Sequence, residues 1–308
     1  MTVTDPLLEG LNPEQQKAVA HAGSPLLVVA GAGSGKTRVL TRRIAYIMAR
    51  RDVLPYEILA ITFTNKAAGE MKERVTELVG PIAKSMWVST FHSSCVRMLR
   101  QEVERLGYSS TFSIYDSADS QKLISRVMET LNLDSKKYPA RQFQHLISNA
   151  KNELQTPYEY LSKATNQFET IVADVYTMYE KRLQQANAMD FDDLIMKTVQ
   201  VLQKHPEAKA RFRSRFRHIL VDEYQDTNHA QYALIKELTG TEGDGFPVAE
   251  LCVVGDADQS IYGFRGATIR NILQFEVDYP SATTVLLEQN YRSTQNILNA
   301  ANAVITKN

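Results

Sequence analysis

Short apolar runs rich in β-branched residues recur along this chain, and segments with helical periodicity lie between them. The runs show little alternation of apolar and polar residues, which is typical of strands buried on both faces of a parallel sheet. They cover residues 26–30, 58–63, 87–91, 219–222, 251–255 and 284–288. Strands that alternate with helices predict an α/β fold, in which a parallel sheet carries helices on both faces and ligands bind at the carboxyl ends of the strands.

The segment from about residue 106 to residue 188 interrupts this alternation. It has helical periodicity and many polar residues, and Asp116 and Ser117 precede its first helical pattern as a cap would. We therefore expect a mostly helical subdomain, residues 109–188, inserted between two parts of the α/β domain, residues 1–108 and 189–308. The glycine-rich acidic segment 239–247 is expected to be a loop.

Composition indicates a globular protein, since 44% of the 308 residues are hydrophobic and 23% are charged. The 35 basic and 35 acidic residues cancel, but a nucleic-acid groove needs only local positive charge. We see no signal peptide and no apolar run near the roughly 20 residues of a membrane span, so we expect a cytoplasmic protein without membrane contact. Cys95 and Cys252 stand among apolar residues and are expected to be packing residues rather than a disulfide.

A glycine-rich loop, AGAGSGKT at residues 30–37, follows the first apolar run. Its glycines allow backbone N–H groups to turn toward phosphate oxygens, and the helix that follows adds its positive N-terminal end. Lys36 can reach the β- and γ-phosphates of a nucleotide, and the Thr37 hydroxyl can ligate Mg²⁺. Ala30 stands where the general motif has glycine, but the strand before the loop and the helix after it supply the context that the motif requires.

Two adjacent carboxylates, Asp222 and Glu223, end a later apolar run. Because side chains alternate along a strand, we expect the two to point in different directions and to have different tasks. Asp222 would hold Mg²⁺ through water, and Glu223 would accept or orient the proton of an attacking water. Taken alone, the pair could be a solvated strand end. Together with Lys36, it predicts a nucleotide-hydrolysis site.

Eight motifs follow one another along the chain. They are LNPEQ at 11–15, AGAGSGKT at 30–37, ITFTNKAAGEM at 61–71, STFHS at 89–93, MDFDDL at 189–194, VDEYQDTN at 221–228, VVGDADQSIYGFRGA at 253–267 and LEQNYRST at 287–294. With them, the chain resembles the first motor domain of superfamily 1A DNA helicases of the UvrD, PcrA and Rep type over nearly all of its length. The resemblance implies a RecA-like P-loop NTPase fold, ATP and Mg²⁺ as cofactors, and 3′→5′ movement on single-stranded DNA.

The resemblance also implies roles around the nucleotide. Gln15 would bond the adenine edge, Tyr291 would stack on the base, and Arg38 would lie near the nucleotide. Gln259 would contact the γ-phosphate or its attacking water, and Arg292 would stabilise charge in the transition state. The loop residues implied to hold phosphate are Ala30, Gly31, Ala32, Gly33, Ser34, Gly35, Lys36 and Thr37. Gln15 and Arg38 could instead be exposed helix residues, and Tyr291 and Arg292 could only fix a strand end.

For DNA, the resemblance implies aromatic stacking platforms and contacts to phosphate or sugar. The implied platforms are Phe63, Phe191, Tyr262 and Phe264, of which the last is more often Trp in the family. The implied polar contacts are Thr64, Asn65, Thr90, His92 and Arg265. Phe63 ends an apolar run and could belong to the core instead.

The basic run 209–217 could also suggest DNA binding. Phe212 and Phe216 are four residues apart in it, so we interpret the run as a solvated helix end with both rings facing inward. His92 has no second potential metal ligand at a suitable spacing, so no metal site is expected there.

The resemblance implies partners beyond these residues. We expect a second RecA-like domain to follow in the same protein, because the sequence stops within a helical pattern soon after Arg292. The other partners of the protein would be single-stranded DNA, junctions of single- and double-stranded DNA, and loading proteins of repair or replication. Two alternatives stay open, which are the ATPase subunit of a helicase–nuclease and a nucleotide- and DNA-binding module without useful turnover.

Overall fold

A computed structural model of the chain divides into two compact units. The structure describes residues 5–256, 270–294, 296, 297 and 299. The first unit consists of Met1–Thr90, Arg211–Thr227 and Leu238–Asn308, and the second consists of Phe91–Ala210 and Asn228–Glu237. The helical unit is thus larger than the expected insert 109–188, whose limits as a domain stay a prediction.

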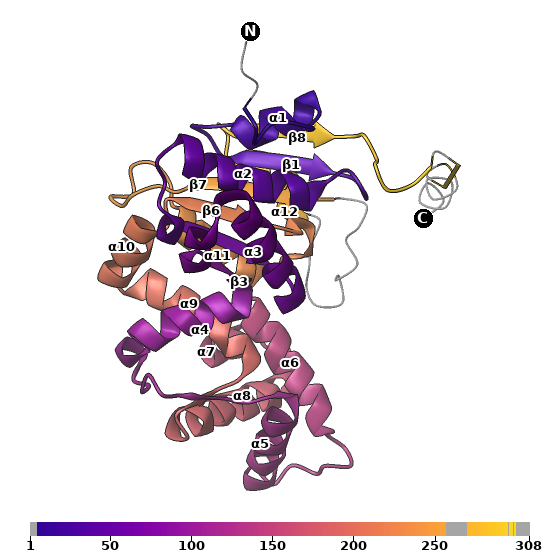
Figure 1. Cartoon of the computed structure of the whole chain (residues 1–308). Coiled ribbons are helices and arrows are strands. Elements are labelled where there is room, and N and C mark those ends of the chain that lie inside the picture. Colours follow the sequence, from indigo (N-terminus) through magenta and orange to yellow (C-terminus); the bar gives the residue numbers. More distant parts are fainter. Residues whose placement is uncertain (1–4, 257–269, 295, 298, 300–308) are drawn as a thin grey trace. The chain divides into compact units, whose positions relative to one another are not determined.

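The first unit contains a six-stranded sheet in the order β3-β2-β6-β7-β1-β8, and every pair of neighbouring strands is parallel (Figure 1). The strands are β1 (Leu26–Ala30), β2 (Ile58–Thr62), β3 (Trp87–Thr90), β6 (His218–Val221), β7 (Glu250–Gly255) and β8 (Thr283–Leu287). All six predicted runs are therefore strands, and the α/β prediction is confirmed. Several strand ends differ by one residue, and the run 219–222 is wrong at its end, because Asp222 lies beyond β6.

Helices cover both faces of this sheet. The helices of the first unit are α1 (Pro13–Ala20), α2 (Lys36–Arg50), α3 (Asn65–Val79) and α12 (Arg270–Asp278), with short 3-10 turns at Pro55–Glu57, Pro81–Ser85 and Tyr224–Asp226. Apolar side chains of α1, α2 and α3 pack in one core cluster with alternate residues of the strands, such as Val28 and Ala60. On the other face, α12 lies against β7, since a Cβ on Gly255 would lie 3.0 Å from Cδ1 of Ile272. Trp87 packs edge-on against Phe216 on this face, with ring centroids 5.0 Å apart.

The parallel register aligns the carboxyl ends of the central strands. Val29 of β1 pairs with Gly255 of β7, and Val221 of β6 pairs with Val253 of β7. The residues that directly follow β1, β6 and β7 therefore leave the sheet at the same edge. This edge is where both predicted halves of the nucleotide site should lie.

The second unit is mostly helical. Its elements are α4 (Phe91–Glu102), a 3-10 turn at Val103–Leu106, β4 (Ser113–Ile114), α5 (Ser117–Thr130), α6 (Ala140–Asn152), α7 (Pro157–Lys163), α8 (Gln167–Gln185), β5 (Ala188–Met189) and α9 (Phe191–Lys204). Helices α10 (Pro206–Arg215) and α11 (His229–Thr239) contain residues of both units. Asp116 caps α5 through a reciprocal capping box, as its position predicted. In the described part of the chain, no helix combines the length and apolarity needed to cross a membrane.

The basic run and the cysteines are packed largely as predicted. Phe212 and Phe216 are buried, and their rings stack with centroids 6.3 Å apart, so the inward orientation of both rings is confirmed. The run is less solvated than expected, because Arg213 is buried and forms an ion pair with Asp244. Cys95 and Cys252 are both free and buried, which confirms the packing prediction.

We predict that His218 makes the protein less stable in mild acid. Burial lowers the pKa of this imidazole to about 4; Glu250 opposes the shift and Arg51 adds to it. The unfolded chain, where a histidine pKa is about 6.5, binds the proton first, so stability is full above that pH and falls as the pH drops toward 4. Between pH 7 and 5 the loss should be about 1–2 kcal/mol in urea unfolding.

In His218→Gln this part of the pH dependence should disappear. His145→Gln is the matched control, because His145 is an exposed histidine on α6. If the stability of His218→Gln falls with pH as steeply as that of the unmodified protein, the burial argument is wrong.

Candidate functional site

The loop between β1 and α2 requires glycine at two positions. Gly33 has a φ of 72° and Gly35 has a φ of 90°, and residues with a Cβ rarely adopt this backbone conformation. A Cβ on Gly33 would lie 2.6 Å from Cβ of Arg292, and a Cβ on Gly35 would lie 2.9 Å from Nε2 of Gln15. The backbone of the loop is therefore closely packed against two other segments, of which the one at Arg292 is far away in the sequence.

Lys36 begins α2 directly after this loop. Its Nζ lies 3.4 Å from Oε2 of Glu223 and 3.8 Å from Oδ2 of Asp256, and only 11% of its side chain is exposed. These three residues follow β1, β6 and β7 respectively. The register of the sheet thus brings the predicted phosphate-binding lysine and a predicted catalytic carboxylate together.

Asp222 and Glu223 have different environments. Asp222 is 6% exposed, and burial raises the pKa of its carboxyl to about 6, with the Glu223 carboxylate adding to the shift. Glu223 is partly exposed and has left-handed backbone, with φ of 50°. This conformation costs about 1–2 kcal/mol in a residue with a side chain. Our reason for their divergence, alternation along a strand, was wrong, because β6 ends at Val221 and the left-handed turn follows it.

Gln225 links the residues that follow two neighbouring strands, Glu223 after β6 and Asp256 after β7. Its Nε2 donates a hydrogen bond to Oε2 of Glu223 at 2.8 Å, and its Oε1 accepts one from the backbone N–H of Asp256 at 3.0 Å. The side chain is buried, with 1% exposed. Sequence reasoning missed both Gln225 and Asp256, although each lies within one of the eight motifs and Asp256 directly follows a strand, and these positions were the available signal.

The segment 290–292 lies against the glycine-rich loop. The backbone N–H of Tyr291 donates to the carbonyl of Gly33 at 2.9 Å, and the Asn290 side chain donates to the carbonyl of Ala32. The Tyr291 hydroxyl accepts from Nδ2 of Asn12 at 2.9 Å, while 56% of Tyr291 stays exposed. The structure therefore brings Tyr291 and the exposed Arg292 to the loop, and it adds Asn290, which sequence reasoning missed.

Gln15 is not an exposed helix residue, so that alternative is wrong. Its side chain is 1% exposed, its Nε2 donates to the carbonyl of Ser34 at 2.9 Å, and its Oε1 accepts from the backbone N–H of Asn12 at 3.1 Å. Gln15 thus ties the start of α1 to the glycine-rich loop. Arg38 is exposed on the first turn of α2, and the contacts of both residues with a nucleotide stay predictions.

Four predicted DNA-contacting residues lie at the ends of β2 and β3 in the first unit. Phe63 is half-buried after β2, so it is neither a core residue nor a fully exposed ring. Thr64 caps α3 by accepting a hydrogen bond from Ala67 at 3.1 Å, and Asn65 is exposed. Thr90 is 8% exposed and ends the neighbouring strand β3.

His92 and Phe191 come together in the second unit. Their rings stack with centroids 3.9 Å apart and planes 24° apart, and 55% of Phe191 is exposed. An exposed aromatic ring that stacks on a second ring with one face keeps its other face for a base. The other predicted residues, Gln259, Tyr262, Phe264 and Arg265, lie outside the described residues.

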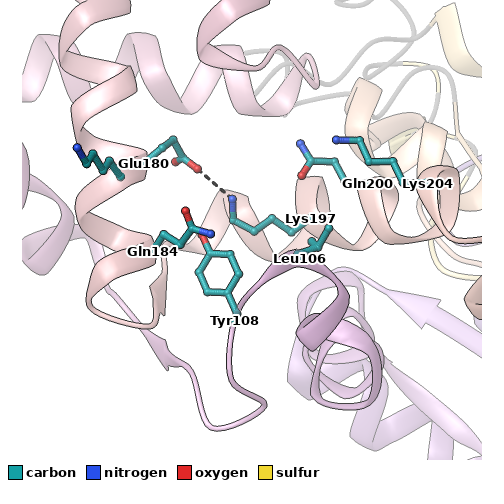
Figure 2. Close-up of a pocket in the computed structure, with 8 residues that line it drawn as sticks. Leu106, Tyr108, Glu180, Gln184, Lys197, Gln200 and Lys204 are labelled. Atoms are coloured by element: carbon teal, nitrogen blue, oxygen red, sulfur yellow. Dashed lines mark hydrogen bonds and ion pairs between the residues drawn. The ribbon is translucent and has the colours of Figure 1, made fainter.

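A pocket of about 370 Å³ also lies in the second unit. Figure 2 shows Tyr108, Gln184 and the ion pair of Glu180 with Lys197 on its wall. None of the residues predicted from the sequence lines this pocket.

The chain is similar in sequence to a family of known proteins and to individual members of known function. Residues 11–280 match the family described as the UvrD/REP helicase N-terminal domain. The chain is 62% identical over 309 residues to the ATP-dependent DNA helicase UvrD1 of Mycobacterium tuberculosis, an alignment that covers 99% of the chain and 40% of that protein. It is 53% identical over 306 residues to the ATP-dependent DNA helicase PcrA of Bacillus subtilis, covering 99% of the chain and 41% of that protein. The chain therefore spans about two fifths of the length of these curated relatives.

We predict that Gly33→Ala lowers the free energy of unfolding by about 1–3 kcal/mol, because the new Cβ adds left-handed strain and displaces the segment 290–292. Urea unfolding would measure the loss. Gly31→Ala is the matched control, because a Cβ at Gly31 would meet no atom within 4 Å. Equal stability of the two variants would contradict the close packing of the loop against Arg292.

Proposed function

Since the chain belongs to the UvrD/REP helicase N-terminal domain family, we propose that it is the first motor domain of an ATP-dependent DNA helicase. Such a motor couples ATP hydrolysis to 3′→5′ movement on single-stranded DNA. The observation that carries the proposal is the meeting of Lys36, Glu223 and Asp256 where three neighbouring parallel strands end. A phosphate-binding lysine beside a carboxylate that can take a proton is what hydrolysis of a nucleotide requires.

The glycine-rich loop fits a triphosphate. Both Gly33 and Gly35 have positive φ, which turns the loop backbone tightly before α2. Gly35, the N-cap residue of α2, has no side chain that could cap the helix, and the positive N-terminal end of a helix suits an anion. Lys36 would then bind the β- and γ-phosphates in place of its contact with Glu223. The residues proposed to bind phosphate are Ala30, Gly31, Ala32, Gly33, Ser34, Gly35, Lys36 and Thr37.

The oxygen donors beside the loop fit Mg²⁺. Thr37 offers a hydroxyl and Asp222 a carboxylate, and such hard oxygen ligands are the ones that Mg²⁺ prefers. With its pKa raised to about 6 by burial, Asp222 is largely ionised at neutral pH and can serve as a ligand. When bound, Mg²⁺ would neutralise charge on the phosphate oxygens.

The remaining residues of the site have separate tasks. Glu223 would accept the proton of the attacking water, and the hydrogen bond from Gln225 holds its carboxylate in place. Arg292 would stabilise the charge of the transition state, and Gln259 would contact the γ-phosphate or its water. The residues proposed around the adenosine are Gln15, Arg38 and Tyr291.

The DNA strand would be held by stacking and by contacts to its backbone. The exposed Phe191 ring, supported by His92, is the observation that favours stacking. The other proposed platforms are Phe63, Tyr262 and Phe264, and the proposed polar contacts are Thr64, Asn65, Thr90, His92 and Arg265. For the whole protein we propose a second RecA-like domain, single-stranded DNA and its junctions with duplex as partners, loading proteins of repair or replication, and a cytoplasmic location.

We predict that Lys36→Ala and Glu223→Gln each abolish unwinding by the full-length protein. Glu223→Gln should slow ATP hydrolysis by roughly 10²–10⁴-fold, because a general base is lost, while ATP binding is kept. Lys36→Ala should also weaken ATP binding, because a contact to the phosphates is lost. Strand separation and ATP hydrolysis assays would measure these effects. Glu73→Gln, at an exposed carboxylate of α3, is the control, and retained unwinding by either site variant would refute the assigned roles.

We predict that the 308-residue chain by itself binds ATP–Mg²⁺ weakly and hydrolyses it slowly. The reason is that it spans about two fifths of its curated relatives, and the proposed second RecA-like domain would complete the ATP site. Single-stranded DNA should raise its rate of hydrolysis by less than about twofold, since DNA would lack the opposite wall of its groove. Robust DNA-stimulated turnover by this chain would contradict the prediction.

A further inference from the structure

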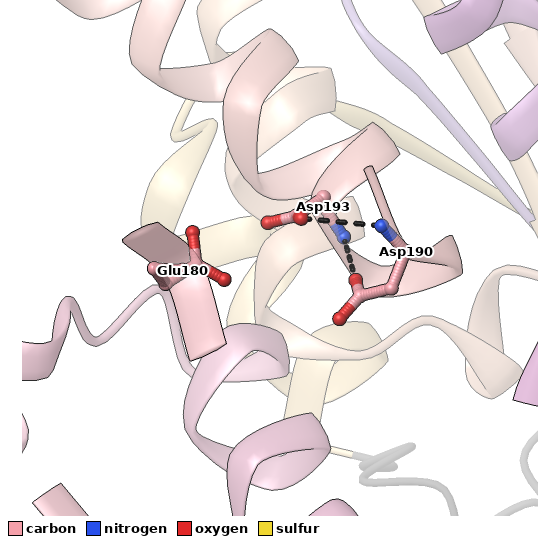
Figure 3. Close-up of side chains that lie close together, drawn as sticks. All are labelled: Glu180, Asp190 and Asp193. Atoms are coloured by element: carbon pink, nitrogen blue, oxygen red, sulfur yellow. Dashed lines mark hydrogen bonds between the residues drawn. The ribbon is translucent and has the colours of Figure 1, made fainter. Parts of the chain in front are cut away.

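A buried charge cluster of five residues lies where α6, α8 and α9 meet in the second unit. The side chain of Lys151 is 0% exposed, and its Nζ lies 2.6 Å from Glu180, 2.7 Å from Asp190 and 2.9 Å from Asp193. Lys197 adds a second ammonium, 2.9 Å from Glu180 and 3.2 Å from Asp193. Figure 3 shows the three carboxylates of this cluster close to one another.

The three carboxylates resemble a metal site, but the protein supplies its own cation. Their oxygens lie within 4.8 Å of one another. The Lys151 ammonium is within 2.9 Å of an oxygen of each, and so occupies the position that a metal ion would need. A buried ammonium paired with several carboxylates is costly to break, because removal of one partner leaves the others uncompensated. The cluster is therefore a rigid anchor.

Asp190 is the point at which the cluster holds the start of α9. Its Oδ2 accepts hydrogen bonds from Lys151 at 2.7 Å and from the Tyr179 hydroxyl at 2.9 Å. Its Oδ1 accepts from the backbone N–H of Asp193 at 2.8 Å, and Asp193 accepts in return from the N–H of Asp190 at 3.2 Å. This reciprocal capping box fixes the first turn of the helix at both of its ends.

Phe191 lies inside this fixed turn. Asp190 precedes it, and Asp192, which accepts a hydrogen bond from Asn152 at 3.3 Å, follows it. The acidic neighbours are thus tied to α6, whereas the Phe191 ring is 55% exposed and stacks on His92 at 3.9 Å. The anchoring of both neighbours fixes the backbone at Phe191, whose ring is exposed and stacks on His92.

We propose that Lys151 is a positioning residue for DNA binding, because its buried ammonium fixes the carboxylates around Phe191 and so holds that ring ready to stack on a base. The inference rests on the proposed function, in which Phe191 is a stacking platform. A ring that is already ordered loses less conformational freedom when a base binds, and binding is correspondingly tighter. Without Lys151, Asp190 and Asp193 would repel each other, and the turn that carries Phe191 would lose its single arrangement.

The test uses the full-length protein and an oligothymidylate strand that carries one 2-aminopurine, whose fluorescence reports stacking. Phe191→Ala should weaken binding of this strand by roughly tenfold, the effect of one lost stack. Lys151→Met should weaken it by about threefold to tenfold and reduce the fluorescence change, since the ring is present but not held. In the Phe191→Ala background, Lys151→Met should add less than about twofold, because there is no ring left to position.

Two further variants separate positioning from loss of folding. Lys197→Met removes the other ammonium of the cluster, which pairs with Glu180 and Asp193 but has no ion pair with Asp190, and should change DNA affinity by less than about twofold. Urea unfolding of both lysine variants establishes that each is folded. If Lys151→Met does not fold, Tyr179→Phe replaces it, because it deletes one hydrogen bond to Asp190 and keeps the ring; about a threefold to fivefold loss of affinity is expected.

The outcomes distinguish the two levels of the proposal. If Phe191→Ala leaves DNA binding unchanged, the proposed function is wrong about this platform, and the inference falls with it. If Phe191→Ala weakens binding but folded Lys151→Met does not, only the inference is overturned. The inference would also be overturned if Lys151→Met weakened DNA binding equally in the unmodified protein and in the Phe191→Ala variant. A general structural effect would then explain the loss. The inference is likewise overturned if Tyr179→Phe, used as the replacement, leaves affinity and fluorescence unchanged.

Discussion

The pairing of β7 with β1 on one side and with β6 on the other is the constraint on which the rest of the site depends. Parallel strands in this register end at one edge of the sheet, so Lys36, Glu223 and Asp256 meet there although they are far apart in the sequence. Their approach needs no special contact of their own, because the backbone ladder already fixes where each strand stops. The glycine-rich loop then closes the site by packing against the segment 290–292.

In both units, buried polar groups support side chains that we propose as site residues. In the first unit, buried Gln225 bonds Glu223, whose backbone is held in a left-handed conformation. In the second unit, buried Lys151 fixes Asp190, the residue that precedes the exposed Phe191. In each case desolvated polar groups have few alternative partners, so the arrangement is specified more sharply than surface contacts could specify it.

Local sequence patterns predicted the strands and the loop well, because their signals lie in consecutive residues. The run 26–30 forms a strand that begins and ends at the predicted residues, and the loop that follows it leads into a helix. Patterns could not predict that β6 stops before Asp222, because a left-handed glutamate has no sequence signature. Nor could they predict the Lys151 cluster, since its members come from three helices and look like ordinary polar residues until the helices pack. Tertiary packing, which spacing alone does not encode, decides both features.

The most direct measurement is a structure of the full-length protein with Mg²⁺ and a non-hydrolysable ATP analogue. Our account predicts that the triphosphate lies on residues 30–37, that Lys36 leaves Glu223 for the phosphates, and that Thr37 and Asp222 face the metal ion. Glu223 should keep its bond from Gln225 and face the γ-phosphate. A nucleotide bound elsewhere, or a Lys36 side chain that stays on Glu223 and contacts no phosphate, would contradict the account.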